Sequence, residues 1–149
     1  MASDSGTAHP HILGFDFGKR RIGIAAGQSR TGTATALGTV ANSDKPDWVA
    51  LSRFVDEWKP SLFVVGLPLS EAGEETPMSA QARSFGARLA DRYGIEVQYQ
   101  DERLTSMDAE RRFAELRAAG EARRKDAARL DALAAKIILE NWLESTGNE

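Results

Sequence analysis

The sequence predicts a single α/β domain in which helices flank a mixed sheet of about five strands. Three observations predict it. The chain has 149 residues, enough for one compact domain and too few for two. Strand-like segments come first, and helical segments alternate with strands later. Residues 62–66 form an uninterrupted apolar run, the pattern of a strand buried on both faces.

The first half of the chain predicts three strands and one helix. Residues 11–18 alternate between two faces, one carrying Leu13, Phe15 and Phe17 and the other Ile12, Gly14 and Asp16. A short turn at Lys19 and Arg20 joins this strand to a second at 21–27, which indicates a hairpin. A weaker third strand covers 35–40. A helix begins at Pro46–Asp47 and ends before Lys59–Pro60.

In the second half, strands and helices alternate. The strand at 62–66 completes a strand–helix–strand unit, right-handed by default. A Gly- and Glu-rich loop, 70–77, precedes a helix at 79–93 that Gly94 terminates. A strand at 95–100 follows, and then helices at 106–118 and 130–143. We expect residues 1–10 to be a disordered leader, 11–145 the domain, and 146–149 a frayed tail.

Composition excludes several classes of protein. The chain has no cysteine, so neither a disulfide framework nor a thiolate metal site is available. No apolar run reaches the length of a membrane span, and residues 1–10 have no hydrophobic signal core, so a cytoplasmic location is the default.

The formal net charge is −3, so any binding of a polyanion depends on local basic patches. One such patch is Lys19, Arg20 and Arg21. A looser group comprises Arg111, Arg112, Arg117, Arg123, Arg124, Lys125 and Arg129. The alternative is that these cations form ordinary solvated surface.

Carboxylates stand at three unusual positions. Asp16 interrupts an apolar strand, where aspartate is disfavoured; it is either a buried group that needs a positive partner or an exposed strand end. Asp101 and Glu102 end a strand, where catalytic groups often gather, although both could be ordinary turn residues before a helix capped by Ser106. Asp131 shares a helix face with apolar Ala134, Ala135 and Ile138, so a role in starting the helix explains it incompletely.

Three acids from separate elements suit a hard cation such as Mg²⁺ or Mn²⁺, which prefers oxygen ligands. The only histidines, His9 and His11, have no spaced partner for a zinc site. Without a well-placed histidine base, metal-activated water is the plausible nucleophile.

Four segments resemble, in order, the YqgF (RuvX) family of RNase H-like nucleases. They are 13–25 (LGFDFGKRRIGIA), 64–69 (VVGLPL), 101–106 (DERLTS) and 131–139 (DALAAKIIL), and together they span nearly the whole domain. The stretch 121–129 departs from the family in being richer in arginine.

The resemblance implies an RNase H-like fold and a bacterial role in trimming the precursor of small-subunit (16S) ribosomal RNA. It implies that Asp16, Glu102 and Asp131 are catalytic metal ligands, with Asp101 as a possible replacement for Glu102. Two metal ions roughly 4 Å apart would then clamp the scissile phosphate. Nearby groups would contact the nucleic-acid backbone without reading its sequence. These substrate-binding groups are Lys19, Arg20, Arg21, Arg103, Thr105 and Ser106.

Three other functions compete with this one. A Holliday junction resolvase would need a homodimer, for which Trp48, Trp58, Phe113 and Trp142 could supply an interface, although aromatic residues at helical positions are more often core. An ATP-binding protein of the actin and sugar-kinase type shares the Asp-x-Gly hairpin but usually needs two lobes. A non-catalytic nucleic-acid-binding module in ribosome assembly would have no need of all three acids.

Overall fold

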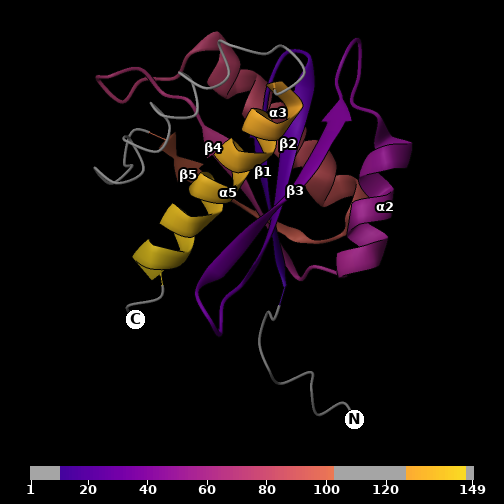
Figure 1. The fold of residues 1–149 in the computed structure, drawn as a ribbon. Helices are drawn as coiled ribbons and strands as arrows, with labels where there is room; N and C mark the ends of the chain where they lie inside the picture. Colours follow the sequence, from indigo (N-terminus) through magenta and orange to yellow (C-terminus); the bar gives the residue numbers. More distant parts are fainter. Residues whose placement is uncertain (1–10, 103–126, 147–149) are drawn as a thin grey trace.

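The predicted sheet is present in the computed structural model, which describes residues 11–102 and 127–146 (Figure 1). The strands are β1 (Ile12–Phe17), β2 (Arg21–Gln28), β3 (Thr33–Ala41), β4 (Leu62–Leu67) and β5 (Glu96–Asp101). They lie in the order β3-β2-β1-β4-β5, with β2 antiparallel to both neighbours and β4 parallel to β1 and β5. This order, with only β2 reversed, is that of the RNase H-like fold, so the predicted fold class is confirmed.

The helices begin and end at recognisable signals. In α2 (Trp48–Trp58) the Asp47 carboxylate accepts a hydrogen bond from the Ala50 N–H at 3.1 Å. Helix α3 (Pro77–Tyr93) begins two residues before the predicted start, because Thr76 caps it reciprocally with Ser79. Gly94 terminates α3 in the left-handed conformation, as predicted.

Helix α5 (Ala127–Thr146) is longer at both ends than the predicted 130–143. The predicted helix at 106–118 lies outside the described residues, as do residues 1–10 and 147–149. Within 11–102 and 127–146, no helix is both long enough and apolar enough to cross a bilayer.

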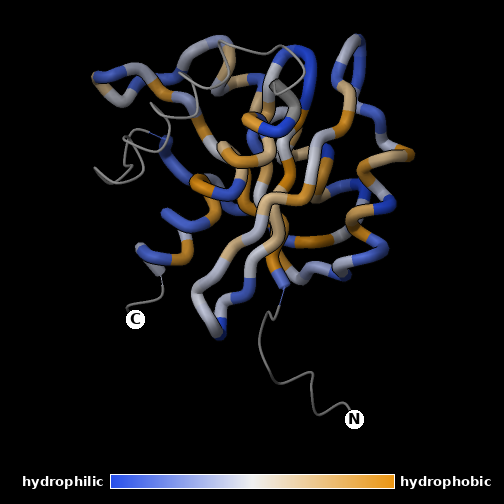
Figure 2. The backbone as a smooth tube through the Cα atoms, viewed as in Figure 1, coloured by the Kyte–Doolittle hydropathy of each residue, from blue (hydrophilic) through white to orange (hydrophobic). Residues whose placement is uncertain are grey.

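The sheet separates two hydrophobic clusters. Figure 1 shows the helices on its two faces, and Figure 2 shows apolar segments along its central strands. Helices α2 and α3 cover one face, where Leu13 and Phe15 of β1 are fully buried. Helix α5 covers the other face, where Ile12 is buried. The predicted division of β1 into two faces is therefore confirmed. The tryptophans pack against these clusters: Trp48 and Trp58 against the first, and Trp142 against the second.

Helix α5 lies close to the strand backbones because glycines face it. A Cβ atom built on Gly14 would be 3.0 Å from the Leu139 Cβ, and one on Gly27 would be 2.8 Å from a Leu139 methyl carbon. These strand glycines therefore allow the close approach of α5.

Candidate active site

Asp16 lies near the end of β1, on the face covered by α5, and has a glycine on each neighbouring strand. Its antiparallel partner on β2 is Gly23. On the other side Phe15 pairs with Val65 of β4, so the next residue, Gly66, lies beside Asp16. Side chains from elsewhere in the chain can therefore approach the Asp16 carboxyl group from both sides.

Each of these glycines makes room for another predicted acid. A Cβ atom on Gly23 would collide with the backbone carbonyl of Asp131, so the beginning of α5 lies directly on this strand position. A Cβ atom on Gly66 would be 2.7 Å from the Glu102 Oε2 atom, so that carboxyl group lies over Gly66. The fold thus brings Asp16, Glu102 and Asp131 close to one another.

Proximity and burial change the acidity of two of these groups. Burial raises the pKa of Asp16 to about 7, and the negative charge of Asp131 adds to the rise. Burial likewise raises the pKa of Glu102 to about 8, with further contributions from the charges of Asp16 and Asp101. Near neutral pH, the protein therefore resists placing full negative charge on this group of acids.

Asp131 has a positive partner. The Arg21 Nε donates a hydrogen bond to the Asp131 Oδ2 at 2.8 Å, and both side chains are about one-third exposed. Arg21 was predicted to contact substrate, but in the structure it binds one of the acids. Lys19 and Arg20 are exposed in the β1–β2 turn, whereas the other predicted substrate contacts, Arg103, Thr105 and Ser106, lie outside the described residues.

The three carboxyl groups are ligands of the kind that a hard cation prefers, but in the structure they are not arranged around a common position. Among residues 11–102 and 127–146, no three acidic or histidine side chains are already arranged to hold a metal ion. Two of the carboxyl groups have raised pKa values, and the third is paired with Arg21. A divalent cation would stabilise the ionised form of buried carboxyl groups, and carboxylate oxygens are the ligands that Mg²⁺ and Mn²⁺ prefer.

Sequence reasoning missed the two glycines and the role of Arg21. A glycine inside a strand often marks the close approach of another backbone or ligand, and that signal was available at Gly23 and Gly66. No comparable signal was available for Arg21, whose partner lies 110 residues further along the chain.

A sheet of this order, with carboxyl groups gathered at the end of β1, defines the class of RNase H-like proteins. A family model described as "RuvX: Holliday junction resolvase" matches residues 10–145. The chain belongs to this RuvX family.

Relatives support the assignment over most of the chain. A protein of Hydrogenovibrio crunogenus named "Putative pre-16S rRNA nuclease" is 47% identical over 135 residues, which are 90% of this chain and 93% of that protein. A relative of the same name from Edwardsiella ictaluri is 46% identical, with 90% and 94% covered.

Among solved structures, RuvC of T. thermophilus in complex with a Holliday junction substrate superposes with a TM-score of 0.49 and 16% sequence identity. That superposition covers 93% of this chain and 96% of the RuvC chain.

Proposed function

We propose that this protein is a divalent-metal-dependent nuclease that hydrolyses phosphodiester bonds in the precursor of 16S ribosomal RNA. The observation that carries the proposal is the flanking of Asp16 by Gly23 and Gly66, which lets Asp131 and Glu102 approach it from opposite sides. The name given to its relatives supports the substrate. The proposal implies a cytoplasmic location and contact with ribosome-assembly partners.

Asp16, Glu102 and Asp131 would hold the cation, either Mg²⁺ or Mn²⁺, with two ions present when substrate is bound. When bound, the cation would activate water and stabilise the leaving oxygen. Asp16 and Glu102 must release their protons for this role, and their raised pKa values make that release depend on pH near neutrality.

Arg21 has two successive roles in this proposal. In the structure its guanidinium group neutralises Asp131. If Asp131 held a cation instead, Arg21 would be free to bind a phosphate of the substrate, together with Lys19 and Arg20 of the adjacent turn.

A second candidate substrate is a four-way DNA junction, because the matching family model is described as a Holliday junction resolvase. Symmetric cleavage of a junction needs two active sites and therefore a homodimer. Cleavage of ribosomal RNA has no such requirement, so strand preference and oligomeric state distinguish the two candidates.

Cleavage of labelled single-stranded RNA, single-stranded DNA and a four-way junction tests the proposal, with Mn²⁺, with Mg²⁺ and with excess chelator. We expect metal-dependent cleavage that is lost in Asp16→Asn and retained in Asp56→Asn, which removes a charge from the exposed surface of α2. Preference for RNA supports the ribosomal substrate, and preference for the junction supports the alternative. A folded protein that cuts none of them with metal present contradicts the proposal and favours a binding module.

A further inference from the structure

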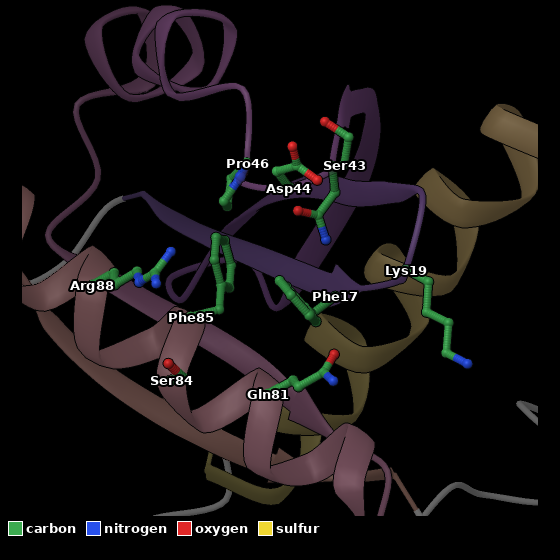
Figure 3. A pocket seen from close by; sticks show the side chains of 10 residues that line it. Phe17, Lys19, Ser43, Asp44, Pro46, Gln81, Ser84, Phe85 and Arg88 are labelled. Carbon is green, nitrogen blue, oxygen red and sulfur yellow. The ribbon is translucent and has the colours of Figure 1, made fainter.

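A polar-edged pocket with an aromatic floor lies on the face of the sheet opposite the acids. It has a volume of about 300 Å³ and lies between helix α3 and the segment 42–46. Figure 3 shows Phe17 and Phe85 between these elements, with Lys19 at one end and Arg88 at the other. Gln81 and Ser84 line it from α3.

The floor is part of a row of three rings. The centroids of Phe17 and Phe85 are 5.1 Å apart with the rings inclined by 35°, and Phe85 stacks on Trp48 at 5.9 Å and 22°. Phe85 is almost fully buried, and Arg92 covers Trp48 at 4.4 Å from the ring centroid. Phe17, which is half-buried, is therefore the ring best placed to stack with a planar ligand.

Three exposed cations follow this surface. Arg88 lines both this pocket and an adjoining hollow, where Arg92, Asp91 and Trp48 are its neighbours. Lys19 stands at the other end of the first pocket. Two exposed acids also line the two hollows, Asp44 the first and Asp91 the second. The cations outnumber the acids, so the surface as a whole favours an anion.

The pocket and the acids are adjacent along the chain. Phe17 immediately follows Asp16, and successive side chains of a strand point to opposite faces of the sheet. The β1–β2 turn, which carries Lys19, lies at this end of the sheet, where its two faces meet. A ligand that passes over the end of β1 would therefore reach both the acids and the pocket.

We propose that this pocket binds an unpaired nucleotide of the substrate strand, beyond the phosphate that is cut. The base stacks on Phe17 and its edge meets Gln81 and Ser84, while Lys19 and Arg88 bind the flanking phosphates. This inference rests on the proposed nuclease function. Because a single strand can bend over the end of the sheet and a duplex is stiff on this scale, the pocket selects single-stranded substrate on that side.

Fluorescence anisotropy of labelled hexanucleotides in excess chelator tests the pocket without cleavage. The probes are oligouridylate, oligothymidylate and a short duplex. Arg88→Glu is compared with Arg30→Glu, which makes the same charge change in the exposed β2–β3 turn near the start of β1, at the other end of the sheet. Ser84→Leu fills the pocket without changing its charge.

We expect Arg88→Glu to weaken binding of both single strands at least about tenfold and Ser84→Leu about fivefold, in keeping with the loss of one stacked base and its phosphate contacts. Arg30→Glu should change binding less than about twofold. Equal effects of Arg88→Glu and Arg30→Glu, or binding unaffected by Ser84→Leu, would overturn the inference. Absence of any binding by wild type would overturn it too.

Cleavage by the same variants with Mn²⁺ separates this inference from the proposed function. If wild type cleaves and Arg88 has no special role, the inference about the pocket fails and the proposed nuclease function stands. If binding depends on Arg88 but no substrate is cleaved, the proposed nuclease function fails and a nucleotide-binding surface remains.

Discussion

Replacing Asp16 by asparagine should stabilise the metal-free protein, and increasingly so as the pH rises. A carboxyl group whose pKa is raised by folding lowers the stability of the protein at every pH at which that group is ionised in the unfolded chain. For Asp16 the pKa rises from 3.8 to about 7. The penalty is therefore absent below about pH 4, grows as the pH rises, and is complete above about pH 7. Asparagine has nearly the same shape and carries no charge at any of these values.

The structure gives the size of the effect. Each unit of pKa shift corresponds to about 1.4 kcal/mol, so a rise of about three units costs about 4 kcal/mol at pH 8 and about 2 kcal/mol at pH 5. Part of the gain is shared with Glu102, because the charge of Asp16 also raises the pKa of Glu102. For a domain of this length, the larger figure corresponds to a Tm increase on the order of 10 °C.

Urea unfolding followed by tryptophan fluorescence, in chelator at pH 5, 6, 7 and 8, measures this difference directly. Asp56→Asn serves as the control, since loss of a single exposed carboxylate should change the stability little. A variant of Asp16 that is less stable than wild type at every pH, or a difference equal at pH 5 and pH 8, would refute the reasoning.

The other predictions concern the cation and the glycines. Affinity for Mn²⁺, measured by calorimetry, should increase between pH 6 and pH 8 as the buried carboxyl groups lose their protons, and Glu102→Gln should flatten this dependence. Arg21→Gln should strengthen Mn²⁺ binding, because Asp131 loses its competing partner, but weaken RNA binding; weaker affinity for both would contradict the two successive roles. Gly66→Ala should reduce cleavage strongly and cost about 1–3 kcal/mol of stability, because its Cβ would lie 2.7 Å from the Glu102 carboxyl group. Gly38→Ala, whose Cβ would meet only an ordinary 3.6 Å contact, should retain activity, and equal losses in the two variants would argue against a specific role for Gly66.

Local patterns were sufficient to predict most of the fold. The alternation in β1 predicted both faces of that strand, and the apolar run of β4 predicted its burial, because each depends on neighbours within a few residues. The start of α3 was predicted two residues late, since Pro77 was assigned to a Gly- and Glu-rich loop. The reciprocal bonds of Thr76 and Ser79 at this point are visible only in three dimensions.

The candidate site likewise combines residues that local patterns identified with contacts that they did not. Asp16 and Asp131 were identifiable because a carboxylate among apolar residues is anomalous within its own segment. What brings them together was not identifiable. Gly23 matters because Asp131 lies on it, and the pairing of Arg21 with Asp131 likewise joins residues more than a hundred positions apart. A single sequence carries no record of such long-range contacts.

The order of the elements along the chain has a consequence for synthesis. Helix α5 follows every strand of the sheet, and it alone brings Asp131 to Gly23. Domains generally begin to fold from their N-terminal part while the chain is still being made. The emerging protein would therefore complete its sheet, with Asp16 in place, well before it had a full set of acids. On the proposed function, a nascent chain remains harmless to the RNA of the ribosome that is making it until helix α5 docks.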